Sequence, residues 1–153
     1  MIETDKLVAI EQIKQLKARY FRAYDTKDYG RFVSLFTPNA RFDMRQAVSV
    51  PNGSSPSQEV ENMLFIGRAN IEAFVRSATP SWSAHHGHNP DIEVKSSTMA
   101  SGIWALEDSV AFLEGGPFRK LHGFGYYHDT YERIDGQWLI ASTQLTRVHL
   151  EVS

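Results

Sequence analysis

A segment near the N-terminus carries polar side chains that could move a proton. Residues 20–25, YFRAYD, place two phenols and a carboxylate at the end of a run with helical apolar spacing. A carboxylate near the base of a core helix is costly unless another group stabilises it. We therefore expect a distant part of the chain to supply a partner for Asp25.

A histidine cluster further along the chain offers this partner. Residues 85–88, HHGH, have the pattern of a strand, on which His86 and His88 share one face and His85 points to the other. A histidine titrates near neutrality, and a carboxylate against one ring nitrogen fixes its tautomer and increases its basicity. If His85 projects toward Asp25, the two form a proton-transfer pair. Taken singly, Asp25 could instead end a helix and His85 could be a hydrogen-bonded core histidine.

The same cluster also admits a metal-binding interpretation. His86 and His88 form an HxH pair, and a third ligand would have to come from a carboxylate or from His122, His128 or His149. Such pairs are common in strands without metal, so we favour surface or rim histidines and predict no metal site. The sequence contains no glycine-rich phosphate loop, nucleophile elbow or dinucleotide fingerprint, and we expect no cofactor.

The apolar spacing predicts helices first and strands afterwards. Helices are expected over Glu3 to Tyr24, after Asp28 as a cap, and from Gly67 to Pro80. Alternation predicts strands near 40–44, 82–88, 91–96, 98–107, 122–134 and 137–149, with Asp135-Gly136 as a hairpin turn. Turn signals also lie at 107–109, which could instead belong to a bent strand, and at 114–117.

This order of elements predicts one α+β domain over residues 1–153. We expect a curved, mostly antiparallel sheet wrapped around the N-terminal helices as a cone or open barrel. Residues 45–62 are polar and rich in turn formers, which favours a surface loop, with a lid over a pocket as the functional alternative.

The composition argues against several classes of protein. Hydrophobic residues make up 42% and charged residues 22%, as in ordinary globular domains. A net charge of −2 with scattered Lys and Arg disfavours nucleic acid or an anionic membrane as partner. The absence of cysteine excludes disulfides and thiolate chemistry. With neither a signal-peptide pattern nor an apolar run of membrane-spanning length, the expected location is the cytoplasm.

Aromatic residues and strand alternation suggest a pocket wall. Nine Phe, six Tyr and three Trp suit a flat hydrophobic ligand. Strand alternation places Trp104 on the same face as Asp108, and Tyr126 on the same face as His128. It does not decide which face lines the pocket. We take Trp104, Tyr24 and Tyr126 as candidate substrate contacts. Arg147 is either half of a surface ion pair or an anion clamp.

The chain resembles the SnoaL-like branch of the nuclear-transport-factor-two-like superfamily, and within it the bile-acid 7-alpha-dehydratase group. The resemblance rests on residues 16–22 with Asp25, then 85–92, 100–108 and 131–138, and finally Arg147. It implies a conical α+β barrel, catalysis without cofactor and assembly into homo-oligomers, trimers or dimers. By this similarity the positions of the dehydratase active site are Tyr20, Asp25, His85, Asp108 and Arg147.

The resemblance and the residues together predict a dehydratase or isomerase acting on a hydrophobic polycyclic or aromatic hydroxy-ketone, with a steroid-like compound as one candidate. His85 would move the proton, Asp25 would orient His85, and Tyr20 would donate a hydrogen bond to the developing charge. Asp108 and Arg147 would support the site or hold a polar end of the substrate. Two alternatives stay open: a non-catalytic ligand-binding or structural subunit of the same fold, as in the beta subunits of aromatic-ring dioxygenases, and an aromatic polyketide cyclase.

Overall fold

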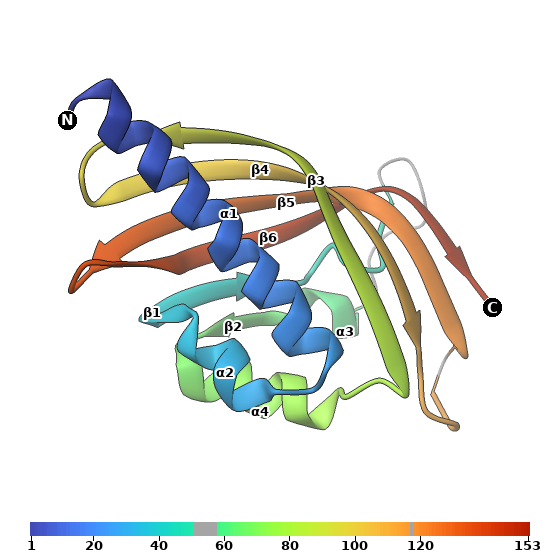
Figure 1. Ribbon diagram of the computed structural model, residues 1–153. Coiled ribbons are helices and arrows are strands. Elements are labelled where there is room, and N and C mark those ends of the chain that lie inside the picture. Colours follow the sequence, from blue (N-terminus) through green and yellow to red (C-terminus); the bar gives the residue numbers. More distant parts are fainter. Residues whose placement is uncertain (51–57, 117) are drawn as a thin grey trace.

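Helices precede a six-stranded sheet in the computed structural model, which describes all residues except 51–57 and 117 (Figure 1). This arrangement confirms the predicted α+β class. None of the described helices is long and apolar enough to cross a membrane. In chain order the elements are α1 (Glu3–Asp25), α2 (Tyr29–Ser34), β1 (Phe36–Asp43), α3 (Gln58–Glu61), β2 (Leu64–Ile66), α4 (Arg68–Ser77), β3 (Trp82–Val94), β4 (Met99–Ala111), β5 (Lys120–Ile134) and β6 (Gln137–Val152).

The sheet has the strand order β2-β1-β6-β5-β4-β3, and α1 lies across one face of its long strands (Figure 1). Neighbouring strands are antiparallel except β1 and β6, which pair in parallel, so the prediction of a mostly antiparallel sheet is confirmed. Because β2 and β3 remain as the two edges, the described sheet is not closed into a barrel.

The buried stripe of α1 differs from the predicted one. The spacing of apolar residues would place Leu7 inside, but it is 61% exposed, whereas the small side chains of Ala9 and Ala23 are buried together with the larger Ile13. Lys17 is fully buried as well, because its ammonium pairs with a carboxylate on the sheet. The buried side of α1 is therefore turned toward a carboxylate on the sheet, a partner that the spacing of apolar residues does not predict.

The short helix α2 begins as predicted. The Arg31 amide donates to the Asp28 carboxylate at 3.3 Å, which caps the helix. Strand β1 begins earlier than predicted and includes Pro38, which lies where the pairing between Phe36 and Arg41 is irregular and needs no ladder hydrogen bond from a proline nitrogen. The expected loop at 45–62 contains α3, and residues 51–57 of this loop lie outside the described part of the chain.

Two predicted breaks in the strands do not occur. Strand β3 is continuous from Trp82 to Val94, and the irregularity at Asn89 is a bulge with φ of 42°. Strand β4 continues through residues 107–109, so the alternative that they belong to a strand is confirmed and no turn forms there. The hairpin turn at Asp135-Gly136 is confirmed, with φ values of 50° and 79° that match a type I′ turn.

A bulge in β6 changes which side chains face the core. Thr130 pairs with Ser142, but Tyr131 pairs with Ile140, so Ala141 is an extra residue. The buried side chains consequently pass from Trp138 and Ile140 to Thr143, Leu145 and Arg147. Uninterrupted alternation would place Leu139 and Ala141 on the same face as Arg147. The bulge prevents this and allows Arg147 to point inward.

Candidate active site

A cavity of about 510 Å³ lies beside the inner face of the sheet, a size suited to a small organic ligand. Most of its wall is apolar, and helices α1, α3 and α4 contribute to it as well as strands. Polar groups interrupt this wall at six described side chains: Tyr20, Tyr24, His85, Asp108, Tyr127 and Arg147.

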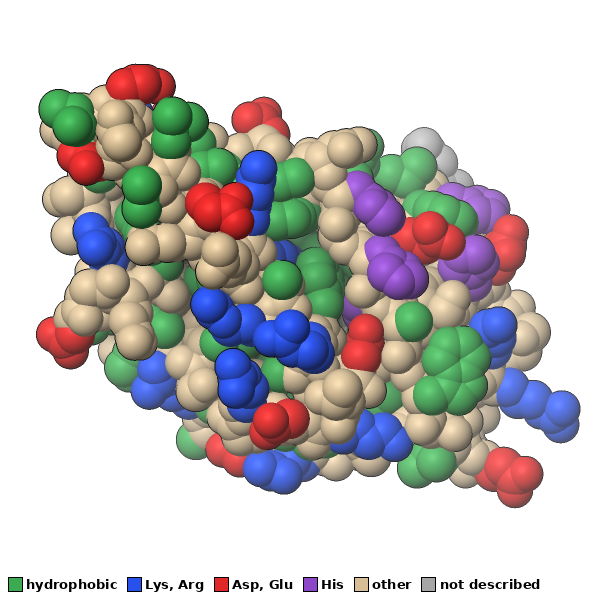
Figure 2. All heavy atoms as spheres, in the orientation of Figure 1, with side chains coloured by type: hydrophobic (Ala, Val, Ile, Leu, Met, Phe, Trp, Pro, Cys, Tyr) green, Lys and Arg blue, Asp and Glu red, His purple; other side chains and the backbone are tan. Residues whose placement is uncertain are grey.

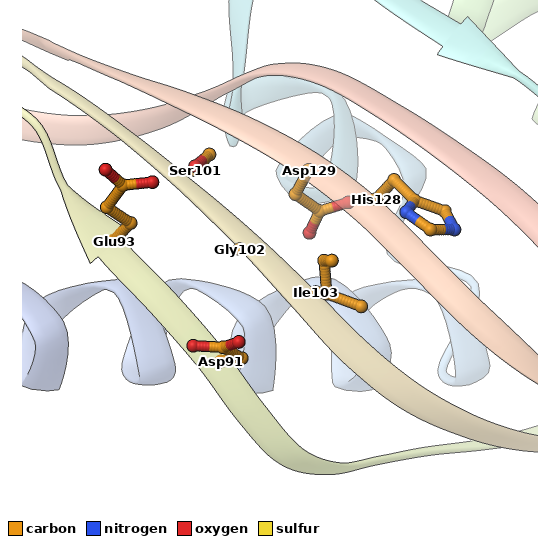
Figure 3. Close-up of a pocket in the computed structure, with 7 residues that line it drawn as sticks. All are labelled: Asp91, Glu93, Ser101, Gly102, Ile103, His128 and Asp129. Atoms are coloured by element: carbon orange, nitrogen blue, oxygen red, sulfur yellow. The ribbon is translucent and has the colours of Figure 1, made fainter.

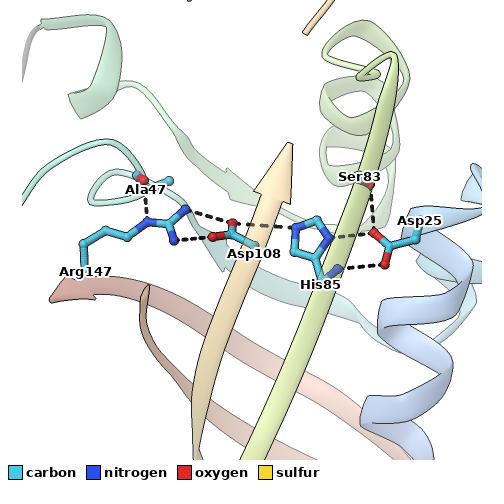
Figure 4. Close-up of polar contacts among 6 residues, drawn as sticks. All are labelled: Asp25, Ala47, Ser83, His85, Asp108 and Arg147. Carbon is cyan, nitrogen blue, oxygen red and sulfur yellow. Dashed lines mark hydrogen bonds and ion pairs between the residues drawn. The ribbon is translucent and has the colours of Figure 1, made fainter. Parts of the chain in front are cut away.

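His85 and Asp25 form the pair that the sequence predicts (Figure 4). The His85 Nδ1 lies 2.6 Å from Asp25 Oδ1, and the His85 amide donates to Asp25 Oδ2 at 2.9 Å. Ser83 Oγ donates a further hydrogen bond to Asp25 Oδ1 at 2.8 Å. Because a carboxylate only accepts hydrogen bonds, Nδ1 carries the hydrogen and Nε2 keeps its lone pair.

Aromatic rings hold the imidazole in place. The ring of Phe21 is nearly parallel to that of His85 at a centroid distance of 6.4 Å, and Tyr24 contacts it edge-on at 5.1 Å. The His85 side chain is only 10% exposed, while that of Asp25 is 22% exposed. The imidazole is thus fixed between two rings and one carboxylate, with Nε2 free for chemistry.

Asp108 and Arg147 form a buried ion pair next to His85 (Figure 4). Arg147 donates from both terminal nitrogens to the Asp108 carboxylate at 2.6 and 2.9 Å, and its Nε donates to the Ala47 carbonyl at 2.7 Å. Such bidentate geometry is the strongest form of this contact. Asp108 Oδ2 lies 3.9 Å from His85 Nε2, too far for a hydrogen bond but close enough to stabilise an imidazolium.

The strand register explains how four strands bring these groups together. His85 on β3 pairs with Asp108 on β4, and Asp108 pairs with Gly123 on β5. A Cβ at Gly123 would lie 2.3 Å from an Arg147 nitrogen and 3.0 Å from Asp108 Oδ1. Gly123 therefore leaves the space through which Arg147 reaches from β6 across β5 to Asp108. The sequence pattern alone does not assign this role to Gly123.

Gly123→Ala is expected to displace the buried guanidinium and to lower the free energy of unfolding by about 1–3 kcal/mol, as overpacking does. Gly30→Ala is the matched control, because nothing lies within 4 Å of a Cβ there and the residue is in α2. This control should be neutral or slightly stabilising. Urea titrations of the two variants test the difference, and equal stability would contradict the role given to Gly123.

Three phenols on the cavity wall (Tyr20, Tyr24 and Tyr127) and the nearby Tyr131 are buried or half-buried. Burial raises the pKa of Tyr20, Tyr24, Tyr127 and Tyr131 above the ordinary value of 10.0. Nearby carboxylates add to this effect, Asp129 at Tyr20 and Asp108 at Tyr127. These phenols consequently stay protonated near neutrality and can act as hydrogen-bond donors.

The raised tyrosine pKa values predict a loss of stability in alkaline solution. Above about pH 10 the unfolded chain releases phenol protons that the folded chain retains, so stability falls by up to about 1.4 kcal/mol per pH unit for each tyrosine. Burial lowers the pKa of Lys17, which opposes this fall up to its ordinary value of 10.5. Urea unfolding at pH 8 and pH 11 measures the net loss, and Tyr127→Phe should make it smaller. A stability independent of pH over this range would refute the prediction.

Two predicted substrate contacts lie away from the cavity, whereas Tyr24 is on its wall. The Trp104 side chain is buried and donates to the Tyr131 hydroxyl at 2.9 Å, and it borders a separate groove between α1 and β3. Tyr126 faces outward and is 43% exposed. The prediction that these two contact the substrate from the cavity wall is therefore corrected. Tyr127, the neighbour of Tyr126, takes the inward position.

Among the residues that the structure describes, other polar groups do not form a comparable site. A depression of about 280 Å³ is bordered by acidic Asp91 and Glu93 (Figure 3). Its His128 is hydrogen-bonded to Thr146, however, and its Asp129 to Lys17. Histidines gather on one face of the molecule (Figure 2). His86 and His88 are exposed, with ring centroids 6.3 Å apart. Among the described residues no group of three or more possible ligands is placed to hold a metal ion.

Comparisons with known proteins agree with this architecture. The SnoaL-like domain family matches residues 5–144. A candidate scytalone dehydratase from Novosphingobium aromaticivorans DSM 12444 superposes with a TM-score of 0.77 at 18% identity, over 99% of this chain and 92% of that chain. The hexachlorocyclohexane dehydrochlorinase LinA-type3 from Novosphingobium barchaimii LL02 gives 0.76 at 19% identity, over 99% and 94%. A candidate aromatic ring hydroxylase from Novosphingobium aromaticivorans gives 0.78 at 20% identity, over 100% and 96%. At these identities the likeness concerns the fold.

Proposed function

The chain belongs to the SnoaL-like domain family, and from this premise we propose that it is a cofactor-independent dehydratase or isomerase that uses His85 to move a proton. The observation that carries the proposal is the 2.6 Å contact between His85 Nδ1 and Asp25, which leaves Nε2 at the wall of an apolar cavity. A general base needs this combination of fixed tautomer, free lone pair and access to the ligand.

The geometry supports a β-elimination from a hydroxy-ketone. Nε2 takes the proton from the carbon next to the carbonyl, and the C–H electron pair forms an enolate. Tyr20 donates a hydrogen bond to the enolate oxygen. The bond to the β-hydroxyl then breaks, and the proton on Nε2 leaves with the hydroxyl as water. In an isomerase the same nitrogen would return the proton to another carbon.

Two carboxylates favour the charged state of His85 during this reaction. Asp25 contacts Nδ1, and Asp108 lies 3.9 Å from Nε2 on the other side of the ring. Arg147 holds Asp108 in place through two hydrogen bonds. We therefore assign Asp25 and Asp108 to orienting His85 and stabilising the imidazolium, and Arg147 to positioning Asp108.

The cavity favours a neutral, hydrophobic substrate. Arg147 is the one Lys or Arg among the described residues of the cavity wall, and Asp108 and the Ala47 carbonyl already engage it. A free carboxylate or phosphate on the substrate would have to compete with Asp108. We propose a polycyclic or aromatic hydroxy-ketone, with steroid-like compounds and cyclised polyketides as the first candidates.

A non-catalytic subunit of this fold is the alternative from a different class. The fold is also that of the candidate aromatic ring hydroxylase, at 20% identity. A purely structural role gives no reason to place His85, Asp25, Asp108 and Arg147 at one cavity wall, so we favour the enzyme. Stable co-elution with a larger metalloprotein subunit would support the structural alternative.

A panel of hydroxy-ketones in D₂O tests the proposal. Mass spectrometry distinguishes loss of one water from a mass-neutral isomerisation and from deuterium uptake at the carbon next to the carbonyl. We expect at least exchange of this proton with neutral, hydrophobic members of the panel. Absence of exchange with every member that binds would overturn the assignment of His85 as a base.

A further inference from the structure

Lys17 is a buried cation that the proposed reaction does not use. Its Nζ lies 2.8 Å from Asp129 Oδ2, and both side chains are fully buried. A buried ammonium is costly to maintain, because the pair must offset the loss of hydration of two charges. Lys17 is absent from the cavity wall, so it does not contact a ligand there directly.

The Lys17 ammonium instead contacts two phenols that do line the cavity. Nζ lies 4.1 Å from the centroid of the Tyr20 ring and 3.9 Å from that of the Tyr127 ring. The two rings come from α1 and β5 and meet nearly edge-on, 5.8 Å apart. The Lys17 ammonium therefore contacts the faces of both rings. Tyr20 and Tyr127 also line the cavity.

Hydrogen bonds fix the position of this cation. Asp129 accepts from the Tyr131 hydroxyl at 2.9 Å and from the Thr143 hydroxyl at 2.6 Å. Trp104 Nε1 in turn donates to the Tyr131 hydroxyl at 2.9 Å. Because each of these polar groups has a partner, the network leaves Lys17 no alternative position among them.

The hydroxyls of Tyr20 and Tyr127 are hydrogen-bonded to each other in this structure. We propose that both turn to an oxyanion on the bound ligand and form a two-donor site for it, and that Lys17 is the positioning residue that fixes and polarises both phenols. A cation on the face of a phenol ring draws electron density from it and makes the hydroxyl a stronger donor. Fixed donors aimed at developing charge need no rearrangement during the reaction. The inference rests on the proposed function, in which the oxyanion is an enolate.

The ligand class that follows is a planar, delocalised oxyanion with an apolar body. Enolates and phenolates carry such charge on one oxygen beside a flat carbon framework, which matches an apolar wall with two phenol donors. The protonated state of both phenols, which their raised pKa values ensure, is the one needed for donation.

Ionisation of bound 2-naphthol tests the site without any substrate. All arms carry His85→Ala, so that no imidazole is present to take the probe's proton, and the outcome is independent of His85 chemistry. Absorbance and fluorescence separate naphthol from naphtholate. We expect the bound probe to ionise about tenfold or more readily than the free probe, the preference that a hydrogen bond to a charged group gives. Tyr20→Phe and Tyr127→Phe should each remove most of this preference.

The role of Lys17 is tested with the charge-free pair Lys17→Met and Asp129→Asn in the same background. With both tyrosines present, we expect the preference for naphtholate to fall at least threefold, whereas a purely structural role would leave it unchanged. Val110→Ala, at an apolar part of the cavity wall, is the control and should alter the binding of naphthol and naphtholate equally. A probe that binds with its free-solution pKa, or a preference that survives Tyr127→Phe, would overturn the two-donor site.

Discussion

His85→Ala is expected to lower kcat by about 10²–10⁴-fold while the protein remains folded, since general acid–base catalysis contributes a factor of this size. The imidazole is the group at the cavity wall with an unoccupied basic nitrogen, and its partner Asp25 is tied to it by two hydrogen bonds. Alanine removes the base but leaves the amide of residue 85, which donates to Asp25 Oδ2, in place. The loss should therefore appear in turnover and not in folding.

The strand itself supplies the controls for this experiment. His86→Ala and His88→Ala remove neighbouring histidines that are exposed on the opposite face of β3. Both should keep turnover within about twofold, because surface substitutions away from a site change little. Circular dichroism and urea unfolding establish that all three variants are folded. A well-folded His85→Ala protein with full activity would refute the mechanism.

The pairing of Asp25 with His85 could be predicted because strong local patterns constrain both residues. Helical spacing places Asp25 at the end of α1, and strand alternation separates His85 from its two neighbours. The charge of Asp25 then requires a partner, and the structure supplies His85 at 2.6 Å. Equally local rules predict the order of helices before strands, the Asp28 cap and the Asp135-Gly136 turn.

Register and bulges could not be predicted in this way. Tyr126 was chosen over Tyr127 because alternation defines two faces without saying which is inside. The fold decides this through long-range pairing, and Ala141 shows how one extra residue reverses the faces within a strand. Residues 107–109 have the composition of a turn, yet pairing with β3 and β5 keeps them in β4. In each of these cases, long-range strand pairing overrides the local preference of the sequence.

Lys17 is the feature that sequence reasoning missed most completely. A lysine in an amphipathic helix is normally exposed, and its partner Asp129 lies 112 positions further along the chain. The only signal available is that Lys17 follows Leu16 and precedes Tyr20 on the buried side of α1. Such a signal does not distinguish a buried ammonium from one that extends to solvent along an apolar surface.

Lys17→Met is expected to lower the free energy of unfolding by about 3–5 kcal/mol, because it leaves the Asp129 carboxylate buried without its cation. Methionine approximates the length of the lysine stem, so the loss reports on charge and not on volume. Lys14→Met is the matched control, since Lys14 lies on the same helix and is exposed. The control should stay within about 0.5 kcal/mol of the unchanged protein.

The double variant Lys17→Met with Asp129→Asn decides how this stability arises. Asparagine keeps an oxygen for the Thr143 hydroxyl but carries no charge, so the uncompensated carboxylate is gone. We expect the double variant to recover at least half of the stability lost by Lys17→Met, because removing both charges of a buried pair is far less harmful than removing one. Urea unfolding of the two single variants and the double variant gives the coupling energy. If the double variant is no more stable than Lys17→Met, then the ammonium stabilises the fold through the rings of Tyr20 and Tyr127 more than through Asp129.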